Sequence, residues 1–208
     1  MNMNWYKHLK TINHHKWLVM KNCFRVGLYK QGLLHDLSKY SWTEFSVGVK
    51  YYQGDRSPND AEREDKGYTS AWLHHKGRNK HHLEYWVDYS TDHSGALAGC
   101  KMPEKYVVEM FCDRIAASKN YNKEKYNDSF PLEYFRKGKA RKNHLLHPET
   151  DALLESLLVM LAEKRGGLYH LTIYGGKYCI IKDRRKNRNK IVIDSNVRLE
   201  KVNKRKRG

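Results

Sequence analysis

The sequence predicts a mainly α-helical protein that ends in a small β-rich segment with a basic tail. Apolar residues recur at helical spacing in most segments of the first 165 residues. After Gly166 and Gly167 the pattern changes to short β-prone runs separated by turn-forming and basic residues. We therefore expect a helical domain over residues 1–167 and a small, basic, β-rich extension over residues 168–208.

Length and composition limit the class of protein. A chain of 208 residues can bury a core without disulfide bonds. Its four cysteines lack CxxC spacing, so neither a zinc ribbon nor a disulfide framework is indicated. The first residues lack the apolar stretch of a signal peptide, and no run approaches the roughly 18 apolar residues of a membrane span. We expect a cytoplasmic protein with no membrane partner.

The net charge of +17 is concentrated near the end of the sequence. Residues 182–208 contain twelve Lys and Arg against three acidic residues, a net charge of +9. A tail of this kind is usually a solvated segment, and it favours at most a weak contact with nucleic acid.

A first helix is expected from residue 4 to about residue 30. Its inward side is formed by residues at i+3 or i+4 spacing, namely Ile12, His15, Val19, Cys23 and Val26. His15 therefore faces the core, whereas His14 lies on the more polar side. Gly32 marks a break, after which LLHDLSKY (33–40) starts a second helical segment.

Residues 41–67 predict one helix and one loop. SWTE at 41–44 matches a capping box, with Ser41 as the N-cap and Glu44 as its partner, so a helix should run to about Tyr52. The polar, turn-rich stretch 53–67 predicts a mobile surface loop.

Two further helices place polar residues inward. YTSAWLHHKG (68–77) predicts a short helix with His75 on the same face as Trp72, and NKHHLEYWVDY (79–89) is expected to be helical as well. After a loop, Pro103 suits the first residue of another helix. On that helix Asp113 shares a stripe with Tyr106 and Met110 and so faces inward.

The remaining segments complete the predicted fold. Residues 120–147 are basic and irregular, and a short helix is possible within them. Pro148 opens an amphipathic helix whose apolar face consists of leucines, and Gly166 and Gly167 end it. The runs LYHLTIY, KYCIIK and KIVID then predict a small hairpin or meander.

The inward polar residues form a candidate metal site. They are His15, the His35–Asp36 pair, His75 and Asp113, each pair or residue on a different predicted helix. Imidazoles and carboxylates are ligands for a divalent transition metal such as Mn, Fe, Co, Ni or Zn, with one or two ions bound. The alternative is that each residue is a core polar group satisfied locally by a tyrosine, a tryptophan or the backbone.

The order of these residues resembles a known family. HDLSK resembles the HD-x-x-K form of the HD superfamily of metal-dependent phosphohydrolases. The stretches from His14 to Phe45, Gly67 to Trp86 and Met102 to Tyr121 resemble more closely an uncharacterised bacterial and phage family, which is related to that superfamily and often labelled "catalase". The resemblance covers roughly residues 5–165 and implies an HD-like helical bundle. The sequence lacks the paired Glu-x-x-His motifs of a dimanganese catalase.

The resemblance assigns roles to individual residues. It implies His15 as a first-helix ligand, His35 and Asp36 as the motif pair, and Asp113 as the closing aspartate. His75 and His82 match histidines that bind a second metal in some HD proteins, although their neighbours His74 and His81 fit equally well. Glu109 could be an outer partner of the ligands or an alternative ligand.

Two residues are expected to act on the substrate. Asp36 would accept a proton or orient a metal-activated water, and Lys39 would neutralise a phosphate oxygen. The alternative for Lys39 is a solvated lysine at a helix end. Glu44 is explained by the capping box and is left out of the site.

These features favour a metal-dependent phosphohydrolase acting on a nucleotide or another phosphate ester. Lys76, Arg78 and Lys80, between the two histidine pairs, would attract such an anionic phosphorylated small molecule. Two alternatives remain: a non-catalytic nucleotide-binding or nucleic-acid-binding module with a structural metal site, and a metal-dependent protein that handles peroxide.

Overall fold

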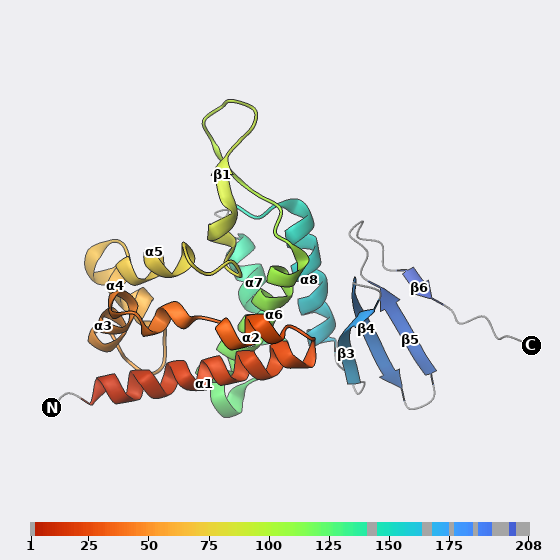
Figure 1. Cartoon of the computed structure of the whole chain (residues 1–208), viewed down its shortest axis with the longest axis horizontal. Coiled ribbons are helices and arrows are strands. Elements are labelled where there is room, and N and C mark those ends of the chain that lie inside the picture. The colour runs from red at the N-terminus through yellow and green to blue at the C-terminus, as the bar shows by residue number, and fades with distance from the viewer. Residues whose placement is uncertain are drawn as a thin grey trace, which may run out of the picture.

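The helical prediction is confirmed by the computed structural model of the chain (Figure 1). It describes residues 3–140, 145–163, 168–174, 177–184, 187–192 and 200–202, and for the last four of these ranges only the backbone. The α-helices of the described residues are α1 (Asn4–Arg25), α2 (Tyr29–Leu34), α3 (Trp42–Lys50), α4 (Pro58–Lys66), α5 (Ser70–Lys76), α6 (Glu104–Asn122), α7 (Phe130–Ala140) and α8 (Pro148–Ala162).

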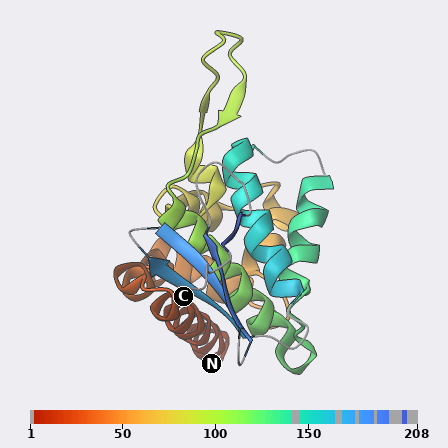
Figure 2. The same cartoon turned by 90° about the vertical axis from the view of Figure 1, so that its right-hand side faces the viewer.

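Three short 3-10 helices and two small sheets complete the described structure. The 3-10 helices are η1 (Leu37–Tyr40), η2 (Leu83–Trp86) and η3 (Lys123–Lys125). Strands β1 (Val87–Tyr89) and β2 (Leu97–Gly99) pair antiparallel, and their hairpin projects from the helices (Figure 2). None of the described helices is long and apolar enough to cross a membrane.

The expected C-terminal meander is present. Strands β3 (Leu168–Tyr174), β4 (Lys177–Arg184), β5 (Asn187–Val192) and β6 (Glu200–Val202) form one antiparallel sheet in sequence order. The division into domains at residue 167 stays a prediction. The basic tail falls largely outside the described residues.

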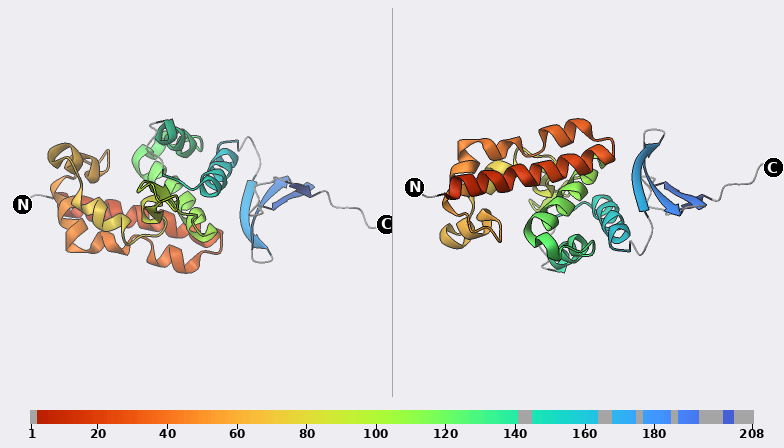
Figure 3. Two further views of the ribbon diagram at one scale, coloured as in Figure 1. Left: turned by 90° about the horizontal axis from the view of Figure 1, so that it is seen from above. Right: turned by 90° about the horizontal axis from the view of Figure 1, so that it is seen from below.

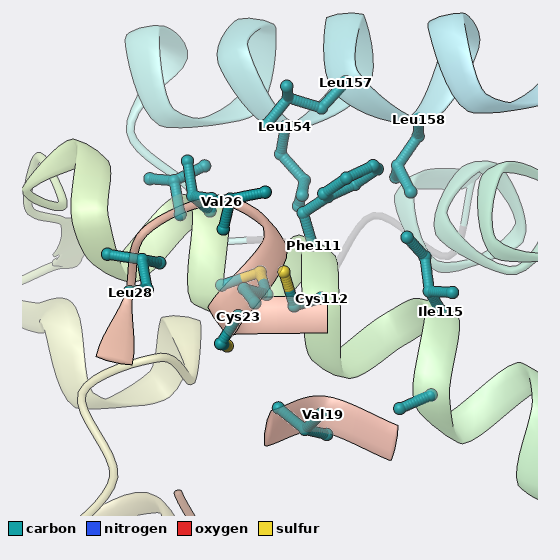
Figure 4. Close-up of a cluster of buried hydrophobic side chains, with 14 of the residues drawn as sticks. Val19, Cys23, Val26, Leu28, Phe111, Cys112, Ile115, Leu154, Leu157 and Leu158 are labelled. Carbon is teal, nitrogen blue, oxygen red and sulfur yellow. The ribbon is translucent and has the colours of Figure 1, made fainter. Parts of the chain in front are cut away.

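The apolar core lies where α1, α6 and α8 meet (Figure 4). The predicted inward side of α1 is buried, with Val19 and Cys23 fully shielded from solvent. Leu154, Leu157 and Leu158 cover this core from α8. Views from above and below show α1 running along one side with α2 and α3 beside it (Figure 3). The core thereby fixes α1 against α6, the two long helices that also contribute to the candidate site.

The loop predicted over residues 53–67 is wrong, because most of it forms α4. The Ser57 side chain caps this helix by accepting a hydrogen bond from the Asn59 amide, and Pro58 occupies its first turn. Gly67 ends the helix with φ 78°, a conformation that glycine adopts without strain. A helix this polar is stabilised by tertiary contacts, which its composition does not reveal.

Glu62 is the main tertiary anchor of α4. Its carboxylate is fully buried and accepts hydrogen bonds from Ser70 Oγ at 2.7 Å, Lys66 Nζ at 3.1 Å and the Ala71 amide at 3.4 Å. Burial alone would raise its pKa, but these donors lower the pKa to about 2. The ionised carboxylate therefore attaches α4 to the start of α5.

The segment 79–89 was predicted to be helical, and this is wrong. It contains η2 and β1, and Trp86 Nε1 donates to the Lys80 carbonyl at 2.7 Å.

The substitution Glu62→Gln should destabilise the protein at pH 7 by about 1.5–3 kcal/mol, because it removes a buried charge with three donors. The folded pKa lies below the ordinary value of 4.5. The stabilisation is therefore present above pH 4.5 and is lost as the pH falls toward 2. Urea unfolding of wild type and variant at several pH values would measure this difference.

The matched control is Glu64→Gln on the same helix. Glu64 is exposed and pairs with Arg56 at 2.7 Å, so its loss should change the free energy of unfolding much less than the loss of Glu62. Equal effects of the two substitutions, or a Glu62 effect that does not change with pH, would contradict the role given to Glu62.

Candidate metal centre

The His35–Asp36 pair lies in the break between two helices, not inside one. Helix α2 contains Gly32 and ends at Leu34, so the predicted break at Gly32 is wrong. Asp36 adopts a left-handed conformation with φ 54°, which Asp tolerates better than most residues. Lys16 Nζ donates to the carbonyls of Leu33 and His35 at 2.8 Å each, which satisfies backbone groups left free where α2 ends.

Asp36 stands at the centre of a cluster of histidines. Its side chain is only 3% exposed. Oδ2 lies 2.6 Å from Lys39 Nζ and 3.3 Å from His35 Nε2. Oδ1 lies 3.2 Å from His75 Nε2 and 3.3 Å from His81 Nε2. The two oxygens of one carboxylate therefore face different groups of imidazoles.

On one side of this carboxylate lie His15, His35 and Asp113, whose ligand atoms are all within 4.8 Å of one another. His15 comes from α1 and Asp113 from α6, and His15 Nε2 is 3.0 Å from Asp113 Oδ1. His35 Nε2 is 3.7 Å from the same oxygen, and His15 Nε2 is 3.7 Å from Asp36 Oδ2. We call these three residues with Asp36 the first group.

On the other side, Asp36, His75, His81 and His82 have ligand atoms that also lie within 4.8 Å of one another. His75 Nε2 and His82 Nε2 are 2.9 Å apart. We call these four residues the second group. The set His15, His35 and Asp113 and the set Asp36, His75, His81 and His82 each have the donor types and spacing that could hold a metal ion. Asp36 Oδ2 also faces His15 and His35, so Asp36 lies beside both sets.

Two buried carboxylates orient the imidazoles from outside. Glu109 Oε1 lies 3.0 Å from His35 Nδ1 and 3.2 Å from His81 Nδ1. Glu44 Oε2 lies 2.8 Å from His75 Nδ1. A carboxylate that accepts the Nδ1 proton leaves the Nε2 lone pair directed into the cluster, as in metal sites of known structure.

Several buried polar atoms of the cluster lack a hydrogen-bond partner within the described part of the chain. They are His15 Nε2, His35 Nε2, Asp36 Oδ1 and His81 Nε2. Unsatisfied buried acceptors are rare and costly in folded proteins. Their concentration on the two sides of one carboxylate is the pattern expected of a site that holds cations.

The electrostatics also favour bound cations. Burial alone would raise the pKa of Asp36, but His35 and Lys39 hold it well below its ordinary value. Burial likewise opposes ionisation of Asp113, but the neighbouring His15 and His35 keep its pKa well below normal. Burial lowers the pKa of His15 and, together with neighbouring histidines, that of His82, so both are neutral imidazoles able to donate a lone pair.

His35 behaves differently from these two histidines. Burial would lower its pKa, but Asp36, Asp113 and Glu109 raise it well above 6.5. The carboxylates that favour a proton on His35 would equally favour a metal cation beside it.

The structure brings together every residue predicted from the sequence. These residues are His15, His35, Asp36, His75, His82, Asp113 and Lys39. In the His74–His75 pair, His75 belongs to the second group. His74 instead contacts Glu44 Oε1 at 2.6 Å. His81 and His82 both belong to the second group as well. That these residues bind metal stays a prediction.

The capping box predicted for Ser41 and Glu44 is wrong. Ser41 occupies the N-cap position before α3, but its side chain makes no capping hydrogen bond, and its Oγ is buried without a partner among the described residues. The Glu44 carboxylate contacts His74 and His75 instead of the backbone of Ser41. A capping-box pattern cannot reveal this difference, because it gives only the spacing of Ser41 and Glu44.

The cluster opens into a cavity of about 760 Å³. Its wall includes His15, Asp36, Lys39, His75 and Asp113. A cavity of this size accommodates a small organic ligand.

The substitution Glu109→Gln should weaken binding of Mn²⁺ or Zn²⁺ by about 10–100-fold, because His35 and His81 would lose the carboxylate that orients them. Metal titration followed by calorimetry would measure the loss. Glu104→Gln, in the first turn of the same helix and outside the cluster, is the control and should bind metal like wild type. Equal affinity of the Glu109 variant and wild type would contradict its role.

Comparisons with known proteins identify a family without an assigned activity. No curated protein and no solved structure matches the chain. A family model described as "Family of unknown function (DUF5662)" matches residues 4–160, which contain all the clustered residues described above. The match fits the expected uncharacterised family and supports neither the HD resemblance nor the catalase label. Because the match spans most of the chain, this protein belongs to the family of unknown function DUF5662.

Proposed function

We propose that this protein is a metal-dependent phosphohydrolase of HD-like plan that acts on a nucleotide or another phosphate ester. The main observation in support is the position of Asp36 between two histidine groups that contain unpaired buried acceptors. Local satisfaction of each polar residue, the alternative considered from the sequence, would leave no such acceptors.

The ligand types favour a divalent transition metal. Imidazole and carboxylate donors suit Mn, Fe, Co, Ni or Zn, and thiolate donors are not part of either group. The first group offers His15, His35, Asp36 and Asp113 to one ion, and the second offers Asp36, His75, His81 and His82 to another. When bound, a divalent cation of this class supplies Lewis-acid activation of water for attack on phosphorus.

Lys39 is the proposed contact to the substrate phosphate. Its side chain is 30% exposed, lines the cavity and reaches Asp36 Oδ2 at 2.6 Å. Asp36 holds the ammonium group beside the cluster, where it can neutralise charge on a phosphate oxygen. Asp36 itself can orient the attacking water between the two groups.

Purified protein should contain one or two equivalents of divalent metal and hydrolyse members of a phosphatase and phosphodiesterase panel. His15→Ala should remove metal from the first group. It should also lower kcat/KM by at least about 10–100-fold, the loss that typically follows when a metal ligand loses its hydrogen-bond partner. Elemental analysis and the panel assay would test both expectations.

The control is His14→Ala, the neighbouring position on α1. His14 is exposed and contacts Asn120 Oδ1 at 3.2 Å, so its variant should keep both metal and activity. Wild-type protein that lacks stoichiometric metal after reconstitution, or a His15 variant that retains full metal content, would refute the proposal.

Lys39→Gln should lower kcat by about 10–1,000-fold, with metal content unchanged, because it removes a cation near the transition state and no metal ligand. Lys30→Gln, an exposed lysine on α2, is the charge-matched control. Parallel kinetics and elemental analysis of the two variants would decide between a substrate contact and a solvated lysine. An unchanged kcat in the Lys39 variant would support the solvated lysine.

A further inference from the structure

The cavity has a second cationic region on α6 and α7, formed around Arg114. Arg114 directly follows Asp113 on α6 and lines the same cavity. Its Nε is shielded from solvent and has no hydrogen-bond partner within the described residues. A guanidinium group in this setting has lost part of its hydration without receiving an acceptor in return.

Arg114 differs in this respect from three other arginines of the described residues. Arg56 pairs with Glu64 at 2.7 Å, Arg63 with Asp60 at 2.9 Å and Arg136 with Glu155 at 3.2 Å. All three are surface residues, for which a partner matters least. Across the described ranges no carboxylate forms an ion pair with Arg114, the more shielded residue.

The carboxylates around Arg114 do not supply a partner. Asp113 faces His15 and His35 in the first group. Glu133 lines the cavity but accepts a hydrogen bond from Ser129 Oγ at 2.5 Å. Glu84 also lines the cavity, and it makes no ion pair with Arg114.

Phe135 holds the guanidinium group in place. The Arg114 guanidinium carbon lies 5.4 Å from the centroid of the Phe135 ring, which is buried on α7. Such cation–π packing orients a planar guanidinium while leaving its N–H donors unused. The forked donors of arginine match the oxygen atoms of a phosphate.

Lys137 adds a further positive charge to the wall of the same cavity. It lies on α7, lines the same cavity, and pairs with no carboxylate in the described part of the chain. Lys39, which we assign to the scissile phosphate, comes from η1 and contacts Asp36. Lys39 therefore comes from a different element of the cavity wall than Arg114 on α6 and Lys137 on α7.

We propose that Arg114 and Lys137 form an anion subsite for a second phosphate group of the substrate. This inference rests on the proposed phosphohydrolase function for the identity of the reacting group and goes beyond it in naming the substrate class. The substrate would carry one phosphate ester at the metal centre and another phosphate at Arg114. A small organic bisphosphate and a short oligonucleotide both have this chemistry.

Binding can be measured without turnover. Calorimetric titration of chelator-treated protein would compare thymidine 3′,5′-bisphosphate, thymidine 5′-monophosphate, thymidine and a thymidine tetranucleotide. Arg114→Gln should weaken bisphosphate binding by about tenfold or more, since it removes charge-assisted hydrogen bonds, and should not change thymidine binding. A loss confined to the tetranucleotide would identify an oligonucleotide substrate, whereas a loss with both ligands would favour recognition of the phosphate alone.

Arg136→Gln is the matched control, because it removes the same charge from the exposed face of α7. It should bind all four ligands like wild type. Equal losses in the two variants would reveal a general charge effect, and no loss in the Arg114 variant would show that the subsite does not exist. Either result overturns the inference.

Stability gives a second, independent test. Because no carboxylate among the described residues pairs with Arg114, Arg114→Met, which keeps an apolar side chain against Phe135, should keep or raise the Tm of ligand-free protein. A decrease of more than about 4 °C would indicate a structural role and overturn the inference. Failure of the subsite would leave metal content and His15-dependent turnover intact. If the phosphohydrolase proposal is wrong, the protein should lack bound metal and His15-dependent turnover, whereas phosphate binding that depends on Arg114 could still be measured.

Discussion

The structure depends on keeping one ionised carboxylate almost completely buried. An unpaired Asp36 would lose its hydration at a cost far above the marginal stability of a domain. Compensation comes from His15 on α1, Lys39 on η1, His75 on α5, and His81 just before η2. Because these residues come from four segments, the same interaction that neutralises Asp36 also holds those segments together.

The charge of the centre is opposite to that of the protein. Asp36, Asp113, Glu109 and Glu44 gather around the histidines with Lys39 as the ammonium partner, in a chain whose net charge is +17. The long-range field therefore attracts anions, whereas the local donors attract cations. A bound cation would reverse the local sign, and only then would an anionic ligand find both fields favourable.

Periodicity along single helices predicted the part of the site that depends on helix geometry. The inward positions of His15 and Asp113 follow from the 3.6-residue repeat of α1 and α6, and both residues face the cluster. Glu44 could not be predicted, because its partners His74 and His75 are about thirty residues away in sequence. Helix α4 has clear capping residues but no apolar stripe, so the buried Glu62 that anchors it gave no periodic signal.

The backbone contacts of Lys16 limit where the length of this chain can change. It follows His15 on α1 and binds the carbonyls of Leu33 and His35, so one turn of α1 both faces Asp36 and fixes the backbone turn that presents it. An insertion or deletion within residues 17–34 would shift that turn relative to both side chains at once. Length changes should therefore be excluded there and tolerated in the β1–β2 hairpin, which projects from the helices.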